Sequence, residues 1–514
     1  MAFALEKPIK GEPPAADDQS IIPGTVNDIA KDADDDDAIL RANGHQTAMP
    51  RQFNWLSALG LGFSITNSWI GYLSCFGQSL TYGGAQACIF SLVAAFIVQF
   101  IVTLGLAELG SAFPSSGGQY HFCYILSPET TRRYSAYIVG WLSVLAWWIV
   151  TCSGISLATV VLNGIVNFCS PEYVANQWQT YLTYVGVSFV TIIPVFTASN
   201  RISLVTQIAL YLSLSGFVIF LVVSVVMHQK MQPQSFLLES GQGNSGWNEG
   251  TAWLLSISNA MYAFGGVDGV PQIMTITMMI GLLTCLPLFI VFMYFTIDME
   301  AIREASLPSL ELVYQITGSR SVTLGLFILL WVIYAYIVSL PSQWVSAGRV
   351  AWAFARDKGT PFPEYFSVVN EKLKFPVRTT VVTFLFSCLY GLLYLASTTA
   401  FNSIITSAVL FLNITYTIPQ GILLTQGRTG LPERYLKLGW VGYFCNAFSV
   451  LWIVVLGVLI CMPPNLPVSL QSMNYVCVIL VGVFTLINVL WLFVGRRSFE
   501  GPHIEWSLVR SKAD

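Results

Sequence analysis

The sequence predicts an all-α polytopic membrane protein with about twelve transmembrane helices. Of its 514 residues, 54% are hydrophobic and only 10% are charged, whereas a soluble domain carries roughly 25% charged residues. Apolar runs of the length that crosses a bilayer, about 20 residues, follow one another from residue 53 onward. Continuous apolarity differs from the alternation of a barrel strand. The composition excludes a soluble enzyme, a nucleic-acid binder and a secreted disulfide scaffold.

The chain is expected to begin with a disordered, acidic, cytoplasmic tail over residues 1–50. This segment holds 10 of the 27 acidic residues and has little to bury. It lacks the basic and then apolar pattern of a signal peptide. We expect the transmembrane domain at 51–498 and a cytoplasmic C-terminal tail at 499–514.

Twelve apolar segments are long enough to be spans. We expect them at residues 54–78, 84–112, 134–168, 178–197, 202–227, 251–267, 272–297, 322–350, 378–397, 402–425, 439–462 and 474–495.

Lysine and arginine placement predicts the orientation, because these residues gather in cytoplasmic connections. With the N-terminus inside, the cytoplasmic connections hold Arg132, Arg133, Arg201, Arg356, Lys358, Lys372, Lys374, Arg378, Arg428, Arg434 and Lys437. The opposite side holds Lys230, Arg303 and Arg320. Both termini are therefore expected in the cytoplasm.

The same rule requires residues 251–297 to cross twice, since one crossing would place the basic 356–378 connection outside. The turn-forming stretch there is Gly265-Gly266-Val267-Asp268-Gly269-Val270-Pro271. One of the two helices must therefore be short.

Two spans contain candidate helix breaks, at Gly62–Gly71 in the first span and Tyr262–Asp268 in the sixth. Irregular backbone at membrane depth is tolerated where it lines a cavity, so breaks in transporter spans indicate binding sites. Close helix packing is the alternative for glycines in membrane helices.

Several motifs resemble those of the amino acid–polyamine–organocation superfamily. Residues 108–120, Glu-Leu-Gly-Ser-Ala-Phe-Pro-Ser-Ser-Gly-Gly-Gln-Tyr, resemble its second-span signature. Residues 340–344, 352–357 and 375–379 resemble its fungal branch of choline, GABA and amino-acid permeases, and 397–420 is most similar to the choline-type members. The resemblance covers about residues 50–500.

This resemblance implies two inverted five-helix repeats plus two C-terminal helices, with substrate held between spans one, three, six, eight and ten. It puts the breaks at Ser68–Gly71 and Phe264–Val267. The substrate-binding candidates are Ser68, Trp69, Ile70, Gly71, Trp148, Tyr262, Phe264, Gly265, Gly266, Asp268 and Trp344.

Trp69 departs from the small residues of amino-acid members, and its indole is suited to a quaternary ammonium through a cation–π contact of about 0.5–2 kcal/mol. An aromatic wall is expected to include Trp147, Trp148, Tyr262, Phe264, Tyr336 and Trp344. Packing or interface anchoring is the alternative for each aromatic side chain.

Asp268 and Glu108 are acids within expected spans, where ionisable residues indicate cation attraction or proton carriage. An interhelical hydrogen bond is the alternative for Glu108, and a place in the turn for Asp268. Ser342 and Ser346, with Ser339, are candidates for a coupling or structural role, although hydroxyls commonly bond to their own helix. H⁺ is favoured over Na⁺ as coupling ion. No cofactor or metal is expected, and the ten cysteines form no CxxC motif.

The chain departs from the family after the sixth-span break, where Val270-Pro271 runs straight into Gln272. Roughly a dozen residues of family members are missing. Either coding sequence has been lost, or a half-helix is rebuilt from residues 269–283, followed by a short seventh span.

The expected function is secondary active transport of a small nitrogenous solute, a choline-like cation or an amino acid or GABA, across the plasma membrane by alternating access. A transport-impaired sensor and an exporter of a cationic natural product are the alternatives. Expected partners are this solute, the lipid bilayer and a coupling ion, without nucleic acid. No enzyme is expected, and no GxxxxGK[ST] motif supports a primary pump.

Overall fold

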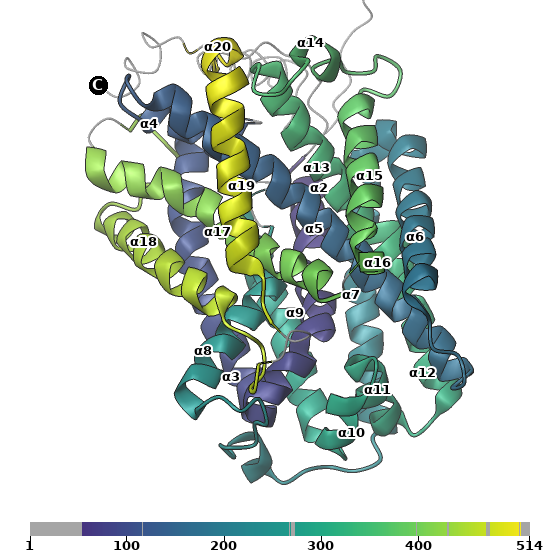
Figure 1. The fold of residues 1–514 in the computed structure, drawn as a ribbon. Helices are drawn as coiled ribbons and strands as arrows, with labels where there is room; N and C mark the ends of the chain where they lie inside the picture. The colour runs from purple at the N-terminus through teal and green to yellow at the C-terminus, as the bar shows by residue number, and fades with distance from the viewer. Residues whose placement is uncertain are drawn as a thin grey trace, which may run out of the picture.

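The computed structural model describes residues 54–502 and 504, apart from 116, 267, 269–272, 397, 429–430 and 469–472. The side chains at 200 and 396–406 are also outside the description. The described part is a bundle of helices (Figure 1), and the β-pairing recorded in it is one isolated bridge between Asn370 and Phe375. The all-α prediction is confirmed.

The helices follow one another with few long connections. They are α2 (Trp55–Thr66), α3 (Ser68–Ala112), α4 (Gln119–Leu126), α5 (Arg132–Cys169), α6 (Gln177–Thr197), α7 (Ile202–Met227), α8 (Glu249–Ala260), α9 (Met274–Tyr294), α10 (Met299–Glu304), α11 (Pro308–Thr317), α12 (Arg320–Trp331), α13 (Ser339–Arg356), α14 (Pro363–Phe366), α15 (Val377–Gly391), α16 (Leu393–Ala396), α17 (Thr398–Gln426), α18 (Trp440–Cys461), α19 (Val476–Leu490) and α20 (Arg496–Ser498). A 3₁₀ turn, η3 (Met261–Phe264), follows α8, and a π-helical segment, η5 (Val332–Val338), joins α12 to α13.

Ten helical segments of the described chain are long and apolar enough to cross a membrane. The first, Trp55–Ala112, covers two of the expected spans, and it is kinked at Gly83 and Gly84, whose backbone is not helical. With 12 residues, α8 is roughly 18 Å long, shorter than the roughly 30 Å of hydrocarbon. The protein is a multi-pass membrane protein, and the count of twelve spans stays a prediction.

The connections that carry most basic residues lie at one end of the bundle. In Figure 1, α14 and α20 are at the top, while α10 and α11 lie at the bottom. The segment between α13 and α15, with its lysines and arginines, is at the top end. This arrangement agrees with the charge rule, and the orientation in a membrane stays a prediction.

The last described residues pack on the bundle beyond the expected boundary at 498. Phe499 is fully buried, and Arg133 on α5 donates through Nε to its carbonyl at 2.8 Å. Lys358 Nζ lies 2.9 Å from Glu500 Oε1. The expected tail 499–514 therefore starts as packed structure, whereas 503, 505–514 and the N-terminal tail 1–50 lie outside the described residues.

A rebuilt half-helix over 269–283 is not observed. Residues 274–283 form the first part of α9, which continues to Tyr294 without interruption. Residues 269–272 lie outside the described chain. The seventh span is this single helix of 21 residues. An apolar run satisfies its backbone hydrogen bonds within the membrane by forming one uninterrupted helix.

Candidate substrate site

The first span is interrupted at a single residue, Asn67. Helix α2 ends at Thr66, Asn67 adopts left-handed backbone angles (φ 34°, ψ 56°), and α3 starts at Ser68. The expected break at Ser68–Gly71 is therefore wrong, since these residues are helical. Asparagine tolerates the left-handed conformation better than most residues, which explains why the chain turns there.

The Asn67 amide joins two distant helices at this interruption. Its Nδ2 donates to Ser339 Oγ at the start of α13 (2.9 Å), and its Oδ1 accepts from Ser213 Oγ on α7 (2.9 Å). Asn67 is buried. Asn67 is not among the candidates predicted from the sequence, although an asparagine within an apolar span was the available signal.

The second interruption follows α8, where η3 leads to an extended Gly265 and to Gly266 with φ 76°. It lies beside the first. A Cβ on Gly266 would be 2.9 Å from Ile65 Cγ2, and one on Gly71 would be 3.7 Å from the Cα of Ala263. The two interruptions therefore lie side by side.

Side chains from three further helices contact Asp268, which follows the second interruption. Its Oδ2 accepts from Gln119 Nε2 on α4 (2.7 Å) and from Trp147 Nε1 on α5 (3.2 Å), and its Oδ1 accepts from Tyr416 Oη on α17 (2.6 Å). All three recorded donors are neutral, so they solvate the carboxylate without neutralising it. Gln119 and Tyr416 were missed because they lie about 150 residues from Asp268 in the chain.

Two other candidate aromatics lie at the interruptions. Phe264 is fully buried and meets Phe96 of α3 edge-on, with ring centroids 5.6 Å apart. The Tyr262 hydroxyl is 2.6 Å from Ser153 Oγ on α5. With Trp147, these side chains form an aromatic rim around the second interruption.

The remaining tryptophan candidates face neighbouring helices. Trp69 donates to Ser213 on α7 (3.1 Å), and Trp344 donates to Thr191 on α6 (3.2 Å). The Trp148 ring lies 4.9 Å from that of Phe386 on α15. Substrate contact by these residues requires a rearrangement and stays a prediction, as it does for Tyr336, which is 41% exposed.

The space beside the first interruption is small. A cavity of about 10 Å³ is lined by residues that include Ile70, Ser74 and Tyr334, which is room for one water molecule.

The serine candidates of the eighth span divide between two kinds of contact. Ser342 donates to Val338 O of its own helical segment (2.8 Å), whereas Ser339 accepts from Asn67. Ser346 and Ser68 are buried. Among the described residues, no group of three or more His, Cys, Asp or Glu side chains is placed to hold a metal ion.

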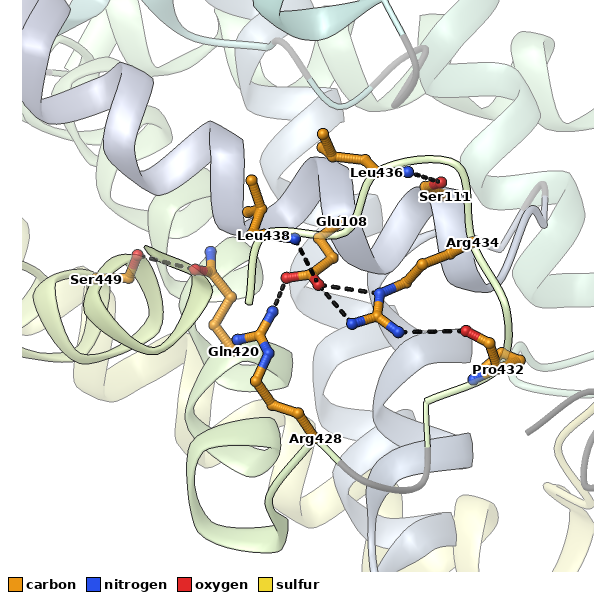
Figure 2. A network of polar contacts seen from close by, with 9 residues as sticks. All are labelled: Glu108, Ser111, Gln420, Arg428, Pro432, Arg434, Leu436, Leu438 and Ser449. Atoms are coloured by element: carbon orange, nitrogen blue, oxygen red, sulfur yellow. Dashed lines mark hydrogen bonds and ion pairs between the residues drawn. The ribbon is translucent and has the colours of Figure 1, made fainter. Parts of the chain in front are cut away.

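Glu108 lies apart from the interruptions, in a cluster at the end of α3 that we call the Glu108 clamp (Figure 2). The clamp consists of Glu108, Arg428, Arg434 and the backbone of Leu438. Arg434 donates through Nε (2.9 Å) and Nη2 (2.7 Å) to Glu108 Oε1, which also accepts from Leu438 N at 3.3 Å. Arg428 pairs with Oε2.

One carboxylate thus holds two guanidinium groups at the connection between α17 and α18. Glu108 is fully buried, and the two arginine side chains are 7% and 12% exposed. Burial, and then the neighbouring Arg434, lower the pKa of Arg428. Glu108 therefore stabilises a pair of like charges that would otherwise separate, and the interhelical alternative describes it better than a place in the substrate site.

Comparison with known proteins gives consistent matches over the whole bundle. A family model described as amino acid permease matches residues 53–484. The choline transporter of Saccharomyces cerevisiae is 29% identical, with 92% of this chain and 87% of the relative covered. The swainsonine transporter of Arthroderma benhamiae is 26% identical (88% and 93% covered), and the 7-keto 8-aminopelargonic acid transporter of Saccharomyces cerevisiae is 24% identical (85% and 91%).

Proposed function

Because the chain belongs to the amino acid permease family of the amino acid–polyamine–organocation superfamily, we propose that it moves a small nitrogenous solute by alternating access. The family is one of transporters rather than enzymes. Two adjoining helix interruptions support the mechanism, since interrupted helices at membrane depth are typical of transporter binding sites. Rocking of α2 and η3 against the bundle would open this place to either side.

Asp268 carries the proposal for the substrate class. Its carboxylate receives hydrogen bonds from three neutral donors, so a cationic ligand would neutralise its negative charge. The rim of Trp147, Tyr262 and Phe264 suits a quaternary ammonium through cation–π contact. We therefore rank a choline-like cation first, in agreement with the relative named as a choline transporter, and a neutral amino acid or GABA second.

Uptake of such a cation across the plasma membrane needs no further energy source in principle. An inside-negative potential contributes about 2.3 kcal/mol per charge per 100 mV. If an ion is coupled, we favour H⁺, because Asn67 Nδ2 already donates to Ser339, the hydroxyl beside the first interruption. Both termini would face the cytoplasm, with the basic connections.

The test is uptake of radiolabelled choline by yeast that lacks its own choline permease. The unmodified chain is expected to restore saturable uptake that excess unlabelled choline inhibits. Asp268→Asn, which removes the charge but keeps the shape, should reduce uptake at least about tenfold, as expected for a lost charged partner. Asp298→Asn, which changes the capping residue of α10, is the control and should retain uptake. Full uptake by Asp268→Asn would refute the assignment.

A solute sensor is the second candidate, because the sequence lacks roughly a dozen residues of family members after Val270-Pro271. Binding of radiolabelled choline without flux would favour this function. An exporter would instead release choline from preloaded cells.

A further inference from the structure

Helix α17 carries two polar side chains on successive turns. Tyr416 donates to Asp268, and Gln420, which is fully buried, donates through Nε2 to the carbonyl of Tyr416 (3.1 Å) and to that of Val102 on α3 (3.0 Å). Pro419 lies between them and has no N–H, so the helix lacks one backbone hydrogen bond at this turn. Beside this weakened turn, the Gln420 side-chain amide gives the Tyr416 carbonyl an additional donor and so helps to hold the backbone that presents Tyr416 to Asp268.

The oxygen of the Gln420 amide points to Ser449 on α18 (Figure 2). Its Oε1 accepts from Ser449 Oγ at 3.0 Å. With its amide oriented to satisfy both neighbours, Asn446 donates to the same Oε1 (3.3 Å) and accepts from Arg428 Nη1 (3.1 Å). Since Arg428 pairs with Glu108, polar contacts run without a gap from Asp268 to Glu108.

Two glycines leave the room that this chain of contacts occupies. A Cβ on Gly105 of α3 would overlap Gln420 Oε1 and lie close to the Asn446 amide. A Cβ on Gly442 of α18 would overlap the guanidinium group of Arg428. The backbone of both helices thus approaches the polar side chains directly, so a shift of one member moves its neighbours.

We propose that Gln420 is a positioning residue that couples the charge state of Asp268 to the Glu108 clamp. This inference rests on the proposed function, because it takes Asp268 as the group that meets the cation. A cation bound to Asp268 weakens the hydrogen bond between Asp268 and Tyr416. The helix turn at Pro419 then shifts. Gln420 moves with this turn, and its contact with Asn446 transmits the movement to Arg428. The contacts of the clamp with the connection between α17 and α18 then weaken.

Hydrogen–deuterium exchange of the purified full chain measures the protection of backbone amides at the clamp, and it requires no substrate. Two amides of the connection are in the clamp region, since Leu438 N donates to Glu108 and Leu436 N donates to Ser111 Oγ at 3.1 Å. Asp268→Asn should speed their exchange roughly tenfold, because a buried network loses a charged acceptor. Gln420→Leu should have a similar effect, and the double variant should exchange no faster than Gln420→Leu alone.

Two observations would overturn the coupling: unchanged exchange in Asp268→Asn, or independent effects that multiply in the double variant. A merely structural Gln420 would give such multiplied effects. If Gln420→Leu does not fold, Ser449→Ala replaces it in the same cycle under the same criteria. Asp357→Asn is the control, because this buried carboxylate also accepts from a tyrosine, Tyr120 (2.8 Å), and it should leave both amides unchanged.

A different experiment tests the proposed function, so its failure can be distinguished from failure of the coupling. If the unmodified chain neither binds nor moves choline, the substrate assignment is wrong, whereas the exchange cycle still decides whether Asp268 and the clamp are coupled.

Discussion

Asn67 combines two roles in one residue, a left-handed backbone and an amide that bridges α7 and α13. Substitutions can separate them. Asn67→Gly keeps the backbone conformation at little steric cost and removes the bridge, whereas Asn67→Ala removes the bridge and also strains the backbone by about 1 kcal/mol or more.

We therefore expect both Asn67 variants to lose choline uptake, with Asn67→Ala also losing more thermal stability than Asn67→Gly. Uptake at equal surface expression and the melting temperature in detergent measure the two roles. Ser213→Ala, which removes one partner of the amide, is the intermediate case. Equal melting temperatures for the two Asn67 variants would show that the left-handed angle carries no strain.

At the residue scale, the sequence indicates the two acids, but it does not indicate the residues that contact them. Asp268 and Glu108 stand out because a charge in an apolar run is expensive. Gln119, Tyr416 and Asn67 are ordinary polar residues until the fold brings distant segments together. Trp69 was singled out for its size, and the structure places its ring 5.4 Å from that of Phe220 on α7.

At the scale of elements, the boundaries that depend on glycine and on hydropathy were predictable, and the details of the interruptions were not. The expected gap between spans at 79–83 adjoins the kink at Gly83 and Gly84. The first interruption lies at Asn67, one residue before the expected break, because asparagine tolerates the left-handed conformation; its side-chain bonds to α7 and α13 are not revealed by a single sequence.

Gly266 gives a direct test of how closely the two interruptions are packed. Its φ of 76° and the 2.9 Å approach of a Cβ to Ile65 Cγ2 predict that Gly266→Ala destabilises the protein by about 1–3 kcal/mol. Gly186→Ala on α6 is the matched control, since no heavy atom would lie within 4 Å of its Cβ, and alanine should stabilise this helix slightly. The melting temperatures should move in opposite directions, and a shared direction would contradict the close packing.

At the scale of the whole molecule, composition alone predicted a helical membrane protein, whereas the anchoring of the C-terminal segment needed the structure. Phe499 packs among aromatic rings, 5.4 Å from Tyr137 and 5.7 Å from Phe354 between centroids. These rings belong to α5 and α13, so the segment after α20 ties these two helices together.

We expect Phe499→Ala to destabilise the protein by about 3–5 kcal/mol, the range for loss of a buried aromatic side chain. Glu500→Gln, which breaks the half-exposed pair with Lys358, should change stability by at most about 1 kcal/mol. Thermal unfolding in detergent compares them. A Phe499→Ala variant as stable as Glu500→Gln would mean that this segment is not anchored by its aromatic ring.

Above all, we propose that Asp268, beside the second interruption, binds the cation. Equilibrium binding of radiolabelled choline to the purified protein tests it most directly, because binding requires neither flux nor a membrane potential. The unmodified chain should bind choline saturably, and Asp268→Asn should bind it at least about tenfold more weakly. Equal affinity in the two proteins would contradict the account.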